Sequence, residues 1–296
     1  MKLKNVARYY DTCPVYDGYT GAYLFKVQPS TFLESSVEGS TSARRVISLA
    51  PELTPPAHSI ILILGELTLL GAGNLDEWKG SAIRRAYWTK KVTGSFSILT
   101  PAEAVLGQPG MAVYGQRQYL KDTVNLPTEA EYDPFWDFYF SASLPQLKGK
   151  FIRGAASLYR VRSDRNDVDG FLTAGSDELE LDPYPITFTS DGVYDPVTDS
   201  YTPSTLVVPG LMIEYYKVFE RLTQADVAYQ AGDMILIVAK SSTTPVANQK
   251  FTAQGTTWRV HNVYTEQDTW SCHVRRGQYQ GFKHLHHEDG EAEGSD

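Results

Sequence analysis

At 296 residues, with 42% hydrophobic and 21% charged side chains, the chain is long enough for one or two domains and too apolar to be wholly disordered. Its 35 acidic against 27 basic residues give a net charge of −8, which argues against a protein that holds nucleic acid by neutralising phosphates. Its two cysteines, Cys13 and Cys272, exclude a dense disulfide framework, and the longest apolar run, Ile60–Leu64, is too short to cross a bilayer.

The first segment, residues 1–50, is rich in Tyr and Ser and has little periodic apolar content. It is predicted to be an extended arm that gains order chiefly by packing on another subunit, with a flexible surface loop as the alternative. We expect Tyr9, Tyr10, Tyr16 and Tyr19 to make contacts between subunits.

Residues 51–182 are predicted to form a first β module with a long insertion at about residues 71–149. Ser59–Leu70 is almost continuously apolar, which predicts a strand buried on both faces. Within the insertion, Pro101–Leu106 predicts a short helix with Pro at its start, ended by Gly107.

Acidic residues are mixed with aromatic ones from Glu129 to Phe140. This composition suits a half-buried contact surface, so we expect Phe135, Trp136 and Tyr139 to lie between subunits. The alternative is a carbohydrate site, in which the aromatic rings stack on sugar and paired carboxylates such as Asp133 and Asp137 act on it.

Phe151–Val161 and Phe171–Ala174 predict a hairpin across a polar turn. Asp164, Asn166, Asp167 and Asp169 in that turn resemble a calcium loop, but the spacing of Gly170 and Val168 favours an ordinary turn.

The turn formers of residues 183–205 predict a linker or surface loop, which places a domain boundary there. Residues 206–282 are then predicted to be a C-terminal β-barrel, and residues 283–296 an acidic, solvated tail. The aromatic and turn-forming content as a whole, 19 Tyr and 12 Phe with 23 Gly and 16 Pro, predicts a mainly β fold of small barrel or sandwich modules with long loops.

Two pairs of segments echo each other. Lys250–Val260 repeats the Lys-Phe, Gly and aromatic-Arg-Val pattern of Lys150–Val161 apart from one inserted residue, and Ile63–Leu69 resembles Tyr229–Leu236. The echoes predict two related β modules, with unrelated strands of one barrel as the alternative.

Motifs for common catalytic chemistry are absent from the sequence: there is no Gly-x-Ser-x-Gly, no Gly-x-x-x-x-Gly-Lys and no His-Glu-x-x-His. His284, His286 and His287 form a His-rich patch without a second cluster to fix metal geometry. We therefore predict a protein that is not an enzyme and that uses no cofactor and no metal.

The last third of the chain orders its motifs as a Gly-Asp turn, a Pro-containing segment, a Gly-x-x-Trp-x-Val strand and a final strand ending in basic residues. The positions that carry this order are Gly232, Asp233, Pro245, Phe251, Gly255, Trp258, Val260, Arg275 and Arg276. This order resembles the small barrel of the head-closure (stopper) and related connector proteins of tailed bacteriophages. In such a barrel we expect Trp258 to fill the core.

The resemblance implies a structural virion protein of the phage neck, assembled in the host cytoplasm. Copies would form a ring of six, or alternatively twelve, between a portal or adaptor ring above and a tail protein below. DNA would pass through the ring without specific binding, which an acidic chain favours, and no membrane would be involved. The chain is longer than a minimal stopper, so a collar or tail-adaptor protein is an equal alternative, and another virion part such as a tail terminator, tail tube or baseplate protein is a further one.

Overall fold

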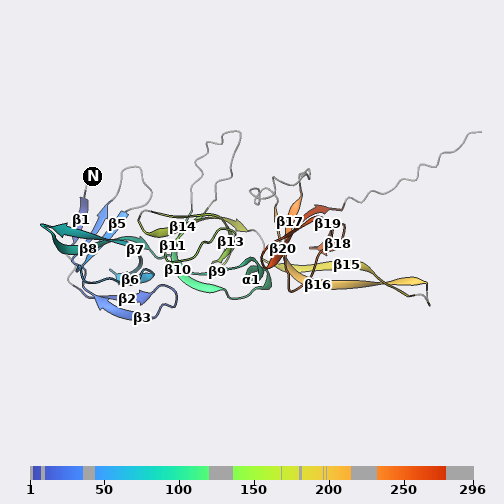
Figure 1. Cartoon of the computed structure of the whole chain (residues 1–296), viewed down its shortest axis with the longest axis horizontal. Coiled ribbons are helices and arrows are strands. Elements are labelled where there is room, and N and C mark those ends of the chain that lie inside the picture. The colour runs from blue at the N-terminus through green and yellow to red at the C-terminus, as the bar shows by residue number, and fades with distance from the viewer. Residues whose placement is uncertain are drawn as a thin grey trace, which may run out of the picture.

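The computed structural model is built almost entirely of strands (Figure 1). It describes residues 3–7, 11–35, 44–119, 136–167, 169–179, 182–195, 197, 199–214 and 232–277. An open eight-stranded sheet is followed along the chain by two closed six-stranded barrels, and the three units lie in line along the long axis of the molecule. The predicted mainly β fold with small barrel modules is confirmed.

The N-terminal unit is an antiparallel sheet with two open edges. Its strands lie in the order β1 (Leu3–Ala7), β4 (Thr31–Ser35), β5 (Arg44–Leu49), β8 (Ser81–Lys91), β7 (Glu66–Trp78), β6 (Ser59–Ile63), β2 (Cys13–Asp17) and β3 (Tyr23–Val27). Side chains from both halves of the sheet, including Val15, Ile47 and Ile61, join in one buried cluster. The sheet therefore curls around its own core.

The prediction of an extended arm is wrong for the part of residues 1–50 that the structure describes, because these residues form strands of this sheet. Cys13, Val15 and Val27 are no more than 2% exposed, because β2 and β3 each turn alternate side chains toward the core. These strands are only five residues long, and the tyrosines in and between them obscure the alternation of buried and exposed positions in the sequence. Tyr9 and Tyr10 lie outside the described residues.

The segment Ser59–Leu70, predicted as one strand, is a hairpin. β6 and β7 pair across a two-residue turn in which Leu64 has φ 50° and Gly65 has φ 79°. Two successive positive φ values are typical of the tight turn that matches the twist of paired strands. Leu64 is 61% exposed at this turn, so its apolar side chain hid the turn from the sequence pattern.

The first barrel follows the sheet directly. Its strands close in the order β10 (Met111–Tyr119), β11 (Trp136–Ser141), β14 (Phe171–Leu179), β13 (Leu158–Asn166), β12 (Phe151–Arg153) and β9 (Gly94–Leu99). β13 and β14 form a hairpin, but the prediction of one strand over Phe151–Val161 is wrong, because this segment contains β12 and the start of β13, which pair with each other. Phe138, Phe140 and Tyr159 are fully buried and fill the barrel interior.

The predicted short helix is also confirmed, as α1 (Pro101–Leu106) between β9 and β10. Thr100 caps it reciprocally: its hydroxyl accepts from the Glu103 amide at 3.2 Å, and its own amide donates to the Glu103 carboxylate at 2.7 Å. Gly107 ends the helix with φ 68°, a conformation that favours glycine.

The second barrel begins where a linker was expected. Its strands close in the order β15 (Tyr184–Asp195), β16 (Ser200–Glu214), β17 (Met234–Ala239), β20 (Thr269–Arg276), β19 (Thr256–Thr265) and β18 (Lys250–Ala253). The prediction of a linker or surface loop at residues 183–205 is therefore wrong, because β15 and β16 form a long hairpin in this segment. The Asp191-Gly192 pair and Pro203 fall at a register shift within the hairpin instead of in a connection between domains.

The two barrels share one topology. When the six strands of each barrel are numbered in chain order, their order around the barrel is first, second, third, sixth, fifth and fourth. The fourth strand then pairs with the first and closes the barrel. Each fifth strand carries a bulge at the same place, between Val161 and Ser163 in the first barrel and between Val260 and Asn262 in the second. These shared irregularities are stronger signs of likeness than the strand order alone, because bulges are specific features of a fold.

The echo at residues 150 and 250 falls in equivalent hairpins, shifted by one position. Val161 donates to the carbonyl of Lys150 at 2.9 Å, and Val260 donates to the carbonyl of Gln249, also at 2.9 Å. Lys150 therefore corresponds to Gln249, which accounts for the single inserted residue in the sequence match. The second echo is not supported, since Ile63–Leu69 lies in the open sheet.

The barrels are joined through an apolar layer that includes α1. Ala104 and Val105 of α1 pack with Leu211 and Ile237, whose strands face the interior of the second barrel with their other side chains. β17 and the Gly210–Ile213 end of β16 are therefore buried on both faces, which explains the unbroken apolar run Ile235–Ala239. A buried layer of this kind should hold the two barrels in a fixed relation.

The sheet meets the first barrel where two backbones approach closely. The amide of Ala72 donates to the carbonyl of Asp169 at 2.9 Å, beside Gly170, which has φ 80°. A Cβ atom on Gly170 would lie 2.1 Å from the Ala72 nitrogen. Only glycine fits this contact without displacing β7.

Replacing Gly170 by alanine should therefore destabilise the junction by more than the cost of a left-handed residue, which is about 1–2 kcal/mol. Gly65 is the matched control, because it has φ 79° but nothing within 4 Å of an added Cβ atom. Urea unfolding of G170A and G65A measures the difference. Equal free energies of unfolding would show that the close approach contributes nothing.

Candidate assembly surfaces

The β7–β8 hairpin projects beyond the N-terminal sheet at one end of the molecule (Figure 1). Its turn is formed by Lys79 and Gly80 with φ of 51° and 77°. Two large apolar side chains near this tip, Trp78 and Ile83, are 66% and 54% exposed. A tryptophan exposed to this degree at the tip of a hairpin is typical of a contact residue.

The β15–β16 hairpin projects at the opposite end. Val197 near its tip is 90% exposed, and Leu206 and Val207 along β16 are 47% and 60% exposed. The molecule thus presents apolar surface on a projecting hairpin at each end.

Asp233 is the centre of a buried ionic network in the second barrel. Its carboxylate contacts Nε2 of His273 at 2.8 Å, and it accepts from Nε and Nη2 of Arg275 at 2.8 and 2.9 Å. The side chains of Asp233 and His273 are 1% and 0% exposed. The hydrogen bond to Asp233 raises the pKa of Arg275 further above its usual range. This network ties the start of β17 to the end of β20, so two of the predicted motif residues, Asp233 and Arg275, meet.

His261 lies beside this network, with its ring centroid 5.5 Å from that of His273. Burial and the neighbouring positive charge of Arg275 lower the pKa of His261. The group is therefore favoured in its neutral form next to the guanidinium.

The other motif residues take structural positions in the same barrel. Pro245, Phe251 and Val260 are buried, while Gly232 and Gly255 adopt positive φ values of 91° and 73° in turns. Arg276 is exposed at the end of β20.

Trp258 is placed differently from the prediction. It pairs with Phe251 across β18 and β19 and packs against the core cluster, but it is only partly buried. The interior is filled instead by Phe188, Phe251 and aliphatic side chains such as Leu236. Trp258 therefore packs against the core cluster from a partly exposed position and does not fill it.

Trp136 forms part of a cluster at the rim of the first barrel. The Arg117 guanidinium lies 4.5 Å from the Trp136 ring centroid and also hydrogen-bonds the hydroxyl of Tyr159. The indole nitrogen donates to Glu178 at 3.1 Å, and the ring of Tyr119 meets that of Trp136 edge-on at 5.0 Å. Arg117 and Tyr119 therefore occupy the ring surface that a stacked sugar would need.

Tyr139 and Asp137 lie on the outside of the same barrel. Tyr139 donates to the Asp137 carboxylate at 3.3 Å, and Lys90 of β8 lies 3.7 Å from the centroid of the Tyr139 ring. Tyr139 thus contacts the N-terminal sheet of its own chain. Burial is the first cause of a raised pKa for both groups, to about 12 for Tyr139. Phe135, Glu129, Glu131 and Asp133 lie outside the described residues.

The raised pKa of Asp137 predicts a pH effect. The folded state favours the protonated carboxyl of Asp137, so protonation of this group stabilises the folded chain. This contribution to the free energy of unfolding is fully present below the unfolded-state pKa of 3.8 and is lost as pH rises through the raised pKa of the folded state. Asp137→Asn should therefore be more stable than the natural chain at neutral pH, with the difference vanishing in acid. Urea unfolding across this pH range measures it, with the exposed Asp182→Asn as control. A constant difference at all pH values would contradict the assignment.

Tyr16 and Tyr19 also make contacts within the chain. Tyr19 hydrogen-bonds Ser143 of the first barrel at 2.8 Å and stacks on His58 at a centroid distance of 4.7 Å. Tyr16 packs on the cluster formed by Ile60 and its neighbours at the junction of sheet and barrel. Both tyrosines thus help to join sheet and barrel, a role that the expected contacts between subunits did not include.

Two carboxylates of the acidic turn at residues 164–170 accept hydrogen bonds from other parts of the chain. Asp164 accepts from the amides of Leu147 and Lys148 at 2.5 and 3.2 Å, and Asp167 accepts from the Thr173 hydroxyl at 2.7 Å. Across the ranges that the structure describes, no three His, Cys, Asp or Glu side chains gather as metal ligands would. The carboxylates of Asp164 and Asp167 thus stabilise the β13–β14 hairpin and its surroundings.

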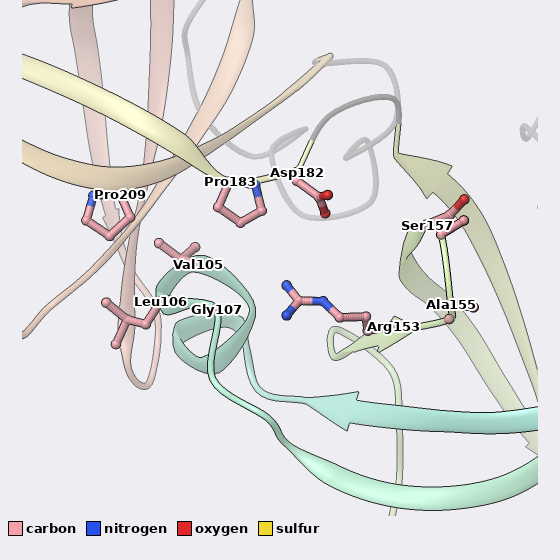
Figure 2. Close-up of a pocket in the computed structure, with 11 residues that line it drawn as sticks. Val105, Leu106, Gly107, Arg153, Ala155, Ser157, Asp182, Pro183 and Pro209 are labelled. Atoms are coloured by element: carbon pink, nitrogen blue, oxygen red, sulfur yellow. The ribbon is translucent and has the colours of Figure 1, made fainter.

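A cleft of about 470 Å³ lies between the barrels, beside the end of α1 (Figure 2). Arg153 extends into it from β12, opposite Pro183 and Asp182 at the entrance to the second barrel. Val105, Leu106 and Pro209 line its other side. A guanidinium, a carboxylate and the hydroxyl of Ser157 are the polar side-chain groups of this lining, and they can orient a ligand.

None of the helical segments in the described ranges has the length and apolar character needed to cross a membrane. In comparisons with known proteins, no family model, no curated protein and no solved structure matches this chain.

Proposed function

We propose that this chain is a structural subunit of the neck of a tailed-bacteriophage virion, where copies form a ring that joins the portal to the tail and encloses the DNA channel. The observation that carries the proposal is the pair of projecting hairpins with exposed apolar side chains, one at each end of an elongated molecule. A subunit that must contact one ring above and another below needs contact surfaces at both of its ends.

The second barrel supports the same proposal. The residues that resemble the stopper barrel occupy turns, core positions and a buried ion network of one closed barrel, so their order in the sequence reflects one structural unit. The net charge of −8 also suits a channel through which DNA slides, because an acidic wall repels phosphate. A tail-terminator, tail-tube or baseplate protein would use the same features, and the position in the virion separates these roles.

The geometry of Trp136 gives no support to the sugar-binding alternative, since Arg117 and Tyr119 cover its ring. The proposal therefore stands on contact surfaces and not on a catalytic cluster.

The N-terminal hairpin provides the test. Trp78→Ser combined with Ile83→Ser should leave the thermal stability of the purified chain unchanged, because both side chains are largely exposed. In virions, the double variant should prevent joining of heads to tails, seen as separate particles by electron microscopy. The control is Val246→Ser, which changes a side chain that is 57% exposed in a loop of the second barrel. Intact virions carrying the double variant would contradict this use of the hairpin.

A further inference from the structure

The free strand edges of the described chain are confined to one unit. Both barrels are closed, so each of their strands has two neighbours, whereas the N-terminal sheet is open and ends at β1 and β3. Among the described strands these two alone have a single partner, β4 for β1 and β2 for β3. An edge strand presents a row of backbone donors and acceptors that another strand can pair with.

The residues of β3 leave its edge accessible. Phe25 and Val27 face the core, while Tyr23 and Leu24 are 56% and 37% exposed. Charges, proline and bulges are the devices that protect an edge. β3 carries one charge, Lys26, and its register with β2 shifts at Leu24, whereas Phe25–Val27 pairs regularly with β2 and leaves its outer edge open. The register of β1 with β4 shifts likewise between Lys4 and Val6.

The directions of the strands decide which partner fits. All neighbouring strands of the eight-stranded sheet are antiparallel, so its two edge strands run in opposite directions. A second copy in the same orientation would therefore place its β1 antiparallel to β3. β1 and β3 have the same length of five residues and lie on opposite sides of the long axis in Figure 1.

We propose that neighbouring copies associate side by side by strand addition, with β1 of one copy pairing antiparallel to β3 of the next, so that the eight-stranded sheets join into one continuous sheet. This heterologous contact, in which β1 of one copy meets β3 of another, uses both edges of every copy. It generates a closed ring or an open filament, depending on the rotation between neighbouring copies. A twofold β3–β3 contact would instead stop at a dimer and leave each β1 edge free. The contact itself does not depend on the proposed neck function, but closure into a ring rests on it.

The natural cysteines allow a clean cross-linking test. Cys13 and Cys272 are buried, and burial raises their pKa values to about 11 and about 12, so neither thiol is reactive at neutral pH. A cysteine introduced on each edge is then the reactive group. Lys4→Cys combined with Leu24→Cys, and Lys4→Cys combined with Lys26→Cys, sample two registers of the pairing.

Oxidation of the purified full chain should give, in one of these double variants, a ladder of disulfide-linked species larger than a dimer. The single variants are the controls: Leu24→Cys or Lys26→Cys alone should give no linked species. A dimer from a β3 single variant would overturn the proposal in favour of the twofold contact. Monomer in both double variants at all protein concentrations would also overturn it.

A second measurement uses charge to block the edge. Leu24→Lys should abolish every species larger than monomer in analytical ultracentrifugation, whereas Leu64→Lys, at a turn position that is 61% exposed, should assemble as the natural chain does. Unchanged circular dichroism and melting temperature establish that the variants are folded. Assembly of folded Leu24→Lys equal to that of the natural chain would overturn the proposal.

Electron microscopy of the same samples separates the two levels of inference. Rings without β1–β3 cross-links would leave the neck function standing and exclude the strand addition. Open filaments with these cross-links would support the strand addition and contradict the ring.

Discussion

Asp233→Ala is expected to destabilise the second barrel by about 3–5 kcal/mol, because it leaves a buried histidine and an arginine without their shared carboxylate. The side chain of Asp233 is 1% exposed, and Arg275 donates two hydrogen bonds to it. Water cannot replace the carboxylate at such a site without opening the contact between β17 and β20. The loss should therefore be concentrated in this barrel.

Hydrogen exchange resolved by peptide measures this effect in each unit separately. Amides of β17 and β20 should exchange faster in Asp233→Ala, while those of the first barrel should be unaffected. Asp76→Ala is the matched control, because Asp76 pairs with Arg84 at 2.6 Å but both side chains are about 40% exposed, and such pairs contribute about 0–1 kcal/mol. Equal losses in the two variants would show that burial of the network is unimportant.

Phe138→Ala is expected to cost a similar amount in the first barrel, about 3–5 kcal/mol, through the cavity that it leaves. Phe138 is fully buried, meets Phe96 edge-on at 5.2 Å and contacts the Tyr159 ring at 5.0 Å. The position corresponds to Leu236 in the second barrel, so the two cores fill the same site with different volumes.

Trp258→Ala is the informative comparison for this variant. Trp258 is larger than Phe138 but only partly buried, so its removal should cost clearly less. Urea unfolding of both variants, followed by hydrogen exchange in each barrel, tests the ranking. A greater loss for Trp258→Ala would place this residue in the core after all.

The parts of the fold that depend on local chemistry could be predicted from the sequence. The Pro at the start of α1 and Gly107 at its end predicted that helix, and strand composition located the start of β14 at Phe171. The other half of the predicted hairpin, Phe151–Val161, divides into β12 and part of β13. The hairpin at Leu64 could not be found in this way, since an apolar residue occupies the turn. The same holds for residues 183–205, where Pro185, the Asp191-Gly192 pair and Pro203 lie within long, bulged strands.

The contact surfaces depend on pairing between distant strands and were therefore beyond sequence patterns. The exposure of Trp78 follows from the length by which β7 and β8 extend past their neighbours. The meeting of Asp233 with His273 and Arg275 follows from the register of β17 and β20. The sequence features that point to this network are the acidic residue of the Gly-Asp motif, which comes just before a buried strand, and the basic residues of the last strand.

The most direct test of the proposed neck function is electron microscopy of particles produced with and without this chain. Without it, we expect filled heads and finished tails that remain separate, and supplying the chain should restore joined virions with a ring of density at the neck. Intact, infectious virions formed in its absence would contradict the account.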